Sequence, residues 1–203
     1  MKKILLLLFI FINLAYGYTY DNLLLKAQAS IFPKIIMLDK KLESKLVDGK
    51  IIYTIVYEKD DYETALEIEK FIDEKYNGHI NDYLYKINLV EFSHLTKETQ
   101  TSAIYSLNSE KQIKKVAEVA RQKGVVTFSY DIDNLKNGLL FSLVLEKSTV
   151  LYCNKNNLHS QDISFVDSLY RIVKFIESRS DTQKRLYNDI PWFENHKIVV
   201  VGL

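Results

Sequence analysis

The sequence predicts an α/β protein with a Rossmann-like, three-layer arrangement, in which a mixed sheet has a parallel core and antiparallel strands near its C-terminal half. Two observations support this class. Between residues 51 and 130, strand patterns alternate with helical patterns, as in right-handed crossovers between parallel strands. From residue 124 to residue 158, three β-rich runs follow one another with only short turns between them, and such short connections predict antiparallel pairs.

The first element expected is a long helix over residues 23 to 46. Asp21 or Asn22 can cap its N-terminus, because both side chains accept hydrogen bonds from free backbone N–H groups. Pro33 removes one backbone donor, so we expect it to kink or divide this helix.

A turn at residues 48 and 49 leads into the first strand and helix of the alternating region. Residues 51 to 57, IIYTIVY, are β-branched or aromatic and predict a buried strand. The helix expected at residues 62 to 78 has apolar residues at helical spacing and ends at Gly78, which suits a left-handed C-cap. These apolar residues are Ala65, Ile68 and Ile72.

The next unit repeats this order of elements. Strands are expected at residues 83 to 92 and 102 to 107, and a helix follows at residues 109 to 124, capped by Asn108 or Ser109. One face of this helix is apolar and is predicted to pack on the sheet. Its residues are Ile113, Val116, Ala117 and Ala120.

The C-terminal half begins with a strand at residues 125 to 130, followed by strands at 139 to 146 and 149 to 154. A helix is expected at residues 162 to 178. The terminal run IVVVGL, residues 198 to 203, is rich in β-branched residues, and an exposed strand of that composition would promote aggregation. We therefore expect it to pair with an edge of its own sheet; the alternative is an edge of a second subunit or of a membrane partner.

The N-terminus has the pattern of a secretory signal peptide. Lys2 and Lys3 precede an apolar run over residues 4 to 14, and Ala15 and Gly17 are the small residues that a signal peptidase reads. Residues 1 to 17 are therefore predicted to be a signal peptide, cleaved after Gly17. The apolar run is too short to cross a bilayer, which needs about 20 residues, and a retained N-terminal anchor is the alternative. We expect a periplasmic protein, with residues 18 to 203 forming a single domain.

The net charge and the cysteine content further limit the classes of function that the sequence allows. The segment predicted to be removed holds two lysines and no acidic residue, so its loss changes the net charge from +1 to −1. Nucleic-acid binding needs a basic face, and this balance argues against it. Cys153 is the only cysteine, so the chain forms no internal disulfide, and we expect its side chain to lie in the core. A reactive thiol or an intermolecular bridge is the alternative.

The sequence contains no recognisable constellation of catalytic, cofactor-binding or metal-binding residues. Its glycines are scattered, whereas a phosphate-binding loop needs several close together, and GxSxG, HExxH and CxxC motifs are absent. Each histidine lies in a predicted connection without metal-ligand spacing. These histidines are His79, His94, His159 and His196. Asp131 and Asp133 lie in a turn, where aspartates commonly bond nearby backbone amides.

Three acidic residues, Glu58, Asp60 and Asp61, have two interpretations. They follow a predicted parallel strand, where α/β folds usually hold ligands. They also precede a helix, whose positive N-terminal dipole end favours negative charge. We favour the second interpretation.

In the C-terminal half, VVTFSY is followed by the run from Gly138 to Leu143, by TVLYCN ending at Asn154, and by DISFVDSLYRIVKFI. This order of elements resembles the YfiR-like family of small periplasmic regulatory proteins. Members have an apolar strand, a turn, a strand led by glycine, a strand closing on asparagine, and a C-terminal helix. Upstream, Lys26 and Ala27 are similar to the pair that begins the first helix of the family. The resemblance covers residues 23 to 178.

The resemblance implies a non-enzymatic regulator that binds an inner-membrane signalling protein, either a diguanylate cyclase or a histidine kinase, and modulates or represses it. A homodimer is possible, and no cofactor or direct membrane insertion is implied. Gly138 would serve a tight turn or close backbone approach, and Asn154 would be a capping or turn residue. Cysteine pairs common in the family are absent here. The alternatives are a periplasmic module that binds a small ligand without a signalling partner, and an enzyme with a dispersed site.

Overall fold

The computed structural model describes residues 18–161 and 163–176. Its strands are β1 (Ile51–Tyr57), β2 (His79–Ile80), β3 (Tyr83–Glu91), β4 (Ala103–Ser106), β5 (Val126–Ser129), β6 (Phe141–Leu145), β7 (Thr149–Asn154) and β8 (Val173–Ile176). Its α-helices are α2 (Asn22–Ile36), α3 (Tyr62–Tyr76), α4 (Ile113–Lys123), α5 (Lys155–Ser160) and α6 (Asp167–Tyr170), and its 3-10 helices are η2 (Leu42–Lys45), η3 (Lys59–Asp61) and η4 (Ile132–Asn137).

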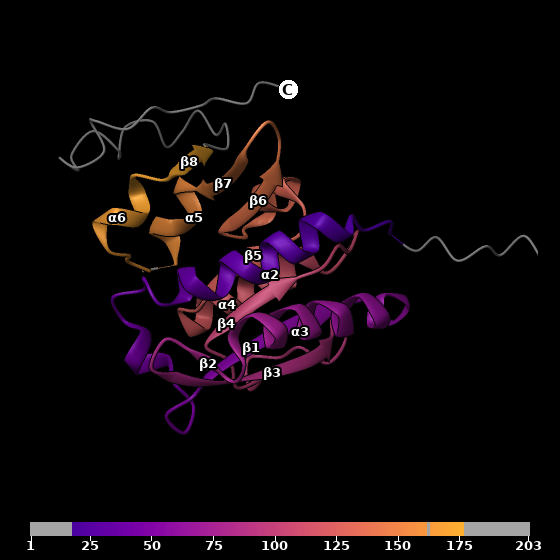
Figure 1. Ribbon diagram of the computed structural model, residues 1–203, viewed down its shortest axis with the longest axis horizontal. Coiled ribbons are helices and arrows are strands. Elements are labelled where there is room, and N and C mark those ends of the chain that lie inside the picture. The colour runs from indigo at the N-terminus through magenta and orange to yellow at the C-terminus, as the bar shows by residue number, and fades with distance from the viewer. Residues whose placement is uncertain (1–17, 162, 177–203) are drawn as a thin grey trace, which may run out of the picture.

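Within these residues, eight strands form one mixed sheet in the order β2-β3-β1-β4-β5-β6-β7-β8 (Figure 1). Neighbours from β3 to β6 pair in parallel, and β7 and β8 are also parallel. The pairs β2 with β3 and β6 with β7 are antiparallel. The predicted α/β class, with a mixed sheet and a parallel core, is confirmed.

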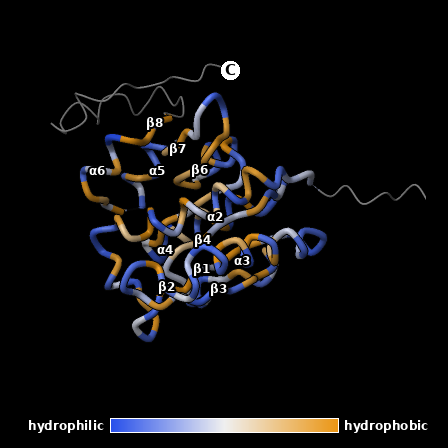
Figure 2. Tube along the Cα trace, viewed as in Figure 1, coloured by the Kyte–Doolittle hydropathy of each residue, from blue (hydrophilic) through white to orange (hydrophobic). Residues whose placement is uncertain are grey.

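Helices cover the sheet on both faces, which gives three layers. Buried side chains of α2 and α3 pack in one cluster with sheet residues such as Tyr53, Tyr105 and Phe128. The apolar face of α4 packs in a second cluster with Val56 and Ile104, whose side chains point to the other face because successive residues of a strand alternate. Both faces of β1 are therefore covered, and all of its seven residues are buried. The connections in Figure 2 are mostly hydrophilic, whereas much of β6, β7 and β8 is hydrophobic.

The first helix differs from its prediction at both Pro33 and its end. Pro33 lies inside α2 without dividing it, and it is buried, as are Phe32, Ile35 and Ile36. A division of the helix at Pro33 is therefore wrong. The helix instead ends at Ile36, and among the residues expected to continue it the structure has only the short 3-10 helix η2. Asp39 stabilises this break, since its carboxylate accepts from the Lys41 N–H at 2.9 Å and pairs with Lys45.

The strands β5 and β6 were expected to be antiparallel and are parallel, with Phe128 opposite Phe141 and Ser129 opposite Ser142. The connection between them folds as η4, which carries the chain back to the starting edge in few residues. The antiparallel prediction for β6 and β7 is confirmed.

The prediction of a helix at residues 162 to 178 is wrong for the residues that the structure describes. They contain the single turn α6 and the strand β8, which pairs with β7. Buried Val173 and Phe175 alternate with Lys174 at the period of a strand, and pairing with β7 decides between two patterns that the sequence allows. The helix α5, between β7 and α6, was not predicted. Residues 1–17 and 198–203, where the signal peptide and terminal strand were expected, lie outside the described residues.

Two helix caps are shifted from their predicted positions. The left-handed C-cap of α3 is Asn77, with φ 48°, and the predicted Gly78 follows it with φ 85°. At the start of α4, Ser109 accepts from the Gln112 N–H at 3.1 Å, but the helix begins only at Ile113. One residue, Asn77, lies between α3 and the predicted cap, whereas a turn of residues 110 to 112 lies between Ser109 and α4.

Candidate functional site

The strand order of the sheet reverses between β1 and β4: strands that follow β1 in the sequence are added first on one side of it and then on the other. From β1 the chain passes through α3 to β3 on one side, and it then returns to β4 on the other side. Open α/β sheets bind ligands outside the carboxyl ends of the strands at such a switch point. Asp61 follows the end of β1 and Asn108 follows the end of β4, so both flank this position.

The side chain of Tyr20 lies between these two strand ends. Its hydroxyl donates to Asp61 Oδ2 at 2.8 Å and accepts from the Asn108 backbone N–H at 3.2 Å. Tyr130, which follows β5, presents its ring edge-on to the Tyr20 ring with 4.7 Å between centroids. The Tyr130 hydroxyl accepts from the Asp21 backbone N–H at 2.8 Å. We call Tyr20, Asp61, Asn108 and Tyr130 the switch-point cluster.

Burial and carboxylate charge shape the electrostatics of this cluster. Burial raises the pKa of the Asp61 carboxyl, the hydrogen bond from Tyr20 lowers it, and the neighbouring Glu58 and Asp60 raise it again. Burial also raises the pKa of the Tyr20 hydroxyl, and its hydrogen bond to Asp61 adds to that effect. The phenol therefore stays neutral at physiological pH and acts as a hydrogen-bond donor to the carboxylate.

The structure separates the three acidic residues singled out in the sequence. Asp61 is buried and bonded to Tyr20, Glu58 accepts a hydrogen bond from the Ser109 hydroxyl, and Asp60 is exposed. Asp61 is the N-cap residue of α3 by position, but its side chain makes no capping hydrogen bond. Its partner is instead Tyr20, which sequence reasoning missed because the two residues are 41 positions apart.

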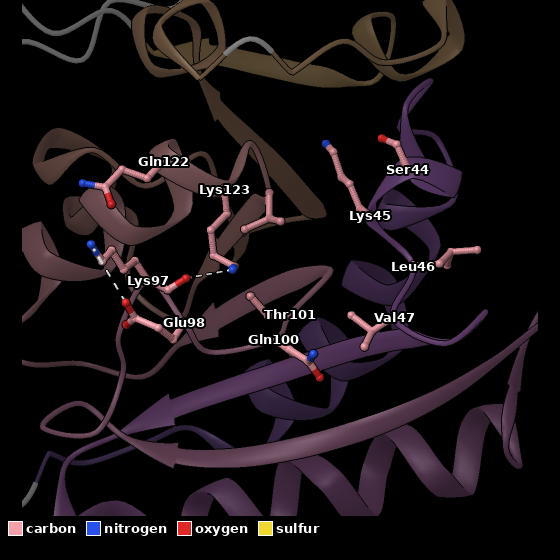
Figure 3. A pocket seen from close by; sticks show the side chains of 11 residues that line it. Ser44, Lys45, Leu46, Val47, Lys97, Glu98, Gln100, Thr101, Gln122 and Lys123 are labelled. Atoms are coloured by element: carbon pink, nitrogen blue, oxygen red, sulfur yellow. Dashed lines mark hydrogen bonds and ion pairs between the residues drawn. The ribbon is translucent and has the colours of Figure 1, made fainter.

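A second candidate is an open pocket of about 550 Å³ at the amino ends of β1, β4 and β5 (Figure 3). The loop that carries η2 forms one wall, and the loop before β4 and the end of α4 form the other. The lining residues are Ser44, Lys45, Leu46, Val47, Lys97, Glu98, Gln100, Thr101, Gln122, Lys123 and Val125.

The cationic groups of this pocket have partners within the protein. Lys45 pairs with buried Asp39, Lys97 lies 3.9 Å from a Glu98 carboxylate oxygen, and the Lys123 ammonium donates to the Lys97 carbonyl at 3.0 Å. Hydrogen bonds with Thr96 and with its own backbone, and then the charges of Lys97 and Lys123, lower the pKa of Glu98. The pocket can therefore hold a polar solute, but its charges are largely balanced.

Gly138 and Asn154 lie together beside η4, away from the switch-point cluster. Gly138 ends η4 with φ 108°, and a Cβ built on it would lie 2.6 Å from the Ala117 Cβ. The Asn154 side chain accepts from the Asn157 N–H at 3.1 Å, which caps α5, and donates to the Leu135 carbonyl at 2.9 Å. Both residues fix how η4 packs between α4 and β7.

The other residues considered in the sequence belong to neither candidate, although Asp131 directly follows Tyr130 of the switch-point cluster. Asp131 accepts from the Asp133 N–H at 2.8 Å, an aspartate turn of the expected kind. Cys153 is buried, as predicted, and burial raises the pKa of its thiol. Among residues 18–161 and 163–176 no group of three or more His, Cys, Asp and Glu side chains could hold a metal ion. No helix of these residues is long and apolar enough to cross a bilayer.

Comparisons with known proteins support the fold and leave the family open. No protein-family model and no curated protein matches the chain. A crystal structure of a conserved domain protein from Vibrio cholerae is similar with a TM-score of 0.52 and 11% identity, over 76% of this chain. The ABC domain of Streptococcus pneumoniae in complex with L-Trp has a TM-score of 0.45 and 12% identity, over 70% of this chain. The chain spans 60% of the length of each of these structures.

Proposed function

We propose that this protein is a non-enzymatic periplasmic regulator that binds an inner-membrane signalling protein and modulates its activity. The resemblance of the sequence to the YfiR-like family motivates this proposal. The structural observation that carries the proposal is that exposed apolar side chains lie on the segments that adjoin Tyr20 and Asp61 of the switch-point cluster.

These side chains belong to Tyr18, Leu23 and Tyr62, which are 38%, 71% and 44% exposed. Tyr18 lies just before Tyr20, Leu23 lies in the first turn of α2, and Tyr62 begins α3. All three belong to segments that start at the carboxyl edge of the sheet. Exposed aromatic and aliphatic side chains around a polar centre are typical of a surface that contacts another protein.

The polar groups at this edge are better suited to holding the fold together than to chemistry. The Tyr20 hydroxyl bonds to both Asp61 and Asn108, so the carboxylate of this set has a partner within the protein. The exposed residues around them then provide the recognition surface, and the periplasmic part of the membrane protein is the proposed partner.

The proposal is tested by measuring signalling output in cells, either cyclic di-GMP concentration or kinase autophosphorylation. Deleting the gene should change that output, and re-expression should restore it. A double variant, Leu23→Ser and Tyr62→Ser, should fail to restore it while remaining folded. Leu84→Ser is the matched control, because Leu84 is 46% exposed but lies at the amino end of β3, opposite the carboxyl edge of the sheet. Full activity of the double variant would contradict the proposed surface.

A separate experiment tests the proposed location. The mature chain should begin at Tyr18 and be recovered from the periplasmic fraction. N-terminal sequencing that finds Met1 retained would contradict a cleavable signal peptide.

The alternative function is a periplasmic module that binds a small ligand, and the pocket of Figure 3 is the observation that favours it. Lys123→Met and Gln100→Leu would replace polar lining by apolar side chains. If the protein is a ligand carrier, these changes should abolish a ligand-induced rise in melting temperature without altering signalling output. Unchanged ligand binding in both variants would exclude this pocket as the binding site.

A further inference from the structure

The four residues before α2 include Tyr20, whose side chain is held by the sheet much as a bound ligand would be. We call residues 18 to 21 the strap. In the strap, Tyr18, Thr19 and Asp21 are exposed and Tyr20 is partly buried. The Tyr20 side chain and the Asp21 N–H attach the strap to segments that follow three different strands of the sheet.

The groups that receive Tyr20 are those that recognise a hydroxylated aromatic ring. Asp61 supplies a carboxylate acceptor at 2.8 Å, Asn108 supplies a backbone donor at 3.2 Å, and Tyr130 supplies an aromatic surface. Binding sites for small ligands commonly combine an aromatic wall with a few placed polar groups. The position is also the one at which open α/β sheets hold their ligands.

We propose that the switch-point cluster is a binding site for a hydroxylated aromatic ring, and that the strap keeps this site closed by supplying Tyr20 from the chain itself. The strap is exchangeable: a tyrosine side chain of another polypeptide, or a small phenol, takes the same place when the strap leaves. This inference does not rest on the proposed signalling role, since it concerns only what the cluster recognises.

The strap competes with any external ring through its covalent attachment. A short tether places Tyr20 at an effective concentration in the millimolar range or above, so external phenols bind poorly to the intact protein. Removing the Tyr20 side chain removes this competition and leaves Asp61, Asn108 and Tyr130 in place.

The test uses the mature chain with Tyr20→Ala and measures melting temperature in the presence of p-cresol, which is the side chain of tyrosine alone. At ten times its dissociation constant, p-cresol should raise the melting temperature of the variant by about 3 to 6 °C. The wild type should bind p-cresol at least tenfold more weakly. Toluene, which lacks the hydroxyl, should bind the variant about tenfold more weakly than p-cresol, because it makes no hydrogen bond to Asp61.

Tyr62→Ala is the matched control. It removes an aromatic ring of the same size from the same edge of the sheet, where Tyr62 packs beside Tyr57 at 5.6 Å between centroids. Its melting temperature should not respond to p-cresol. An equal response of both variants, or none in Tyr20→Ala, would overturn the proposal.

A second probe distinguishes the two sources of the ring. The peptide Gly-Tyr-Thr-Tyr-Asp, which copies residues 17 to 21, presents the ring with its flanking backbone. Tighter binding of the peptide than of p-cresol to Tyr20→Ala indicates a site for a polypeptide segment. Equal or weaker binding indicates a site for a small phenol.

Tyr20→Phe keeps the test decisive if Tyr20→Ala fails to fold. This variant keeps the ring and loses both hydrogen bonds of the hydroxyl. If the hydroxyl holds the strap in place, amide hydrogen exchange should become at least tenfold faster at Asp21, whose N–H bonds to Tyr130 rather than to Tyr20. Unchanged exchange at Asp21 would show that the strap does not depend on recognition of the hydroxyl, and would refute the proposal.

Discussion

Replacing Gly138 with alanine tests how closely η4 packs on α4. Gly138 has φ 108°, and an added Cβ would lie 2.6 Å from the Cβ of Ala117. The neighbouring atom belongs to a short side chain, which cannot turn away. The variant must therefore move η4 or α4 as well as hold alanine in a left-handed conformation.

The two effects differ in size and can be separated. A left-handed conformation costs a residue other than glycine roughly 1 to 2 kcal/mol. Overpacking by one methyl group in a tight contact adds about 1 to 3 kcal/mol. We expect Gly138→Ala to lower the free energy of unfolding by about 2 to 5 kcal/mol. Gly124→Ala is the control, because Gly124 has φ 62° but nothing within 4 Å of an added Cβ, so only the first cost applies.

Urea unfolding of the wild type and variants measures these free energies. Ala117→Gly removes the atom that the new methyl group meets, and by itself should cost about 1 kcal/mol of helix stability. In the Gly138→Ala background the same change should restore part of the lost stability. Two results would refute the reasoning: equal costs at Gly138 and Gly124, or strictly additive effects of the two changes at Gly138 and Ala117.

Two further predictions follow from buried titratable groups. The pKa of Asp61 is raised above 3.8 in the folded state, so the folded protein holds the carboxyl proton more tightly than the unfolded chain does. The stability that this group contributes is therefore present at low pH and falls as pH rises through its folded pKa. Asp61→Asn keeps an acceptor for Tyr20 and should reduce this fall in stability. The urea midpoints of variant and wild type should therefore differ by an amount that changes between pH 4 and pH 7. A constant difference over this range would contradict the assignment. Cys153 is 1% exposed and burial raises the pKa of its thiol, so iodoacetamide should label it only as fast as the protein opens, and urea should accelerate labelling sharply; rapid labelling of the native protein would count against the buried position.

The parallel core was predictable because each element carries one consistent pattern. Every residue of β1 is apolar or small enough to be buried, and α3 shows its buried residues at helical spacing. The segment from Ile163 to Ile176 was not predictable in the same way. Its apolar residues satisfy both helical and strand periods, and only pairing with β7 favours the strand.

Of the residues in the switch-point cluster, only the position of Asp61 could be predicted from the sequence. Asp61 could be placed at the end of a strand from its neighbours in the sequence. Tyr20 could not be assigned to it, since Tyr20 precedes the first recognisable element and its partners Asp61 and Asn108 lie 41 and 88 positions further along the chain. A tyrosine ahead of a helix cap carries no local signal of a partner that distant.

The strap also has a consequence for the order in which the molecule is made. Residues 18 to 21 leave the ribosome before every other part of the described fold, yet Asp21 bonds to Tyr130, a residue synthesised 109 positions later. Contacts of such large sequence separation form late, because the intervening chain must first be ordered. The earliest segment synthesised is therefore among the last to reach its native contacts. The Asp21 N–H therefore stays without its native partner until Tyr130 has been synthesised and β5 has docked.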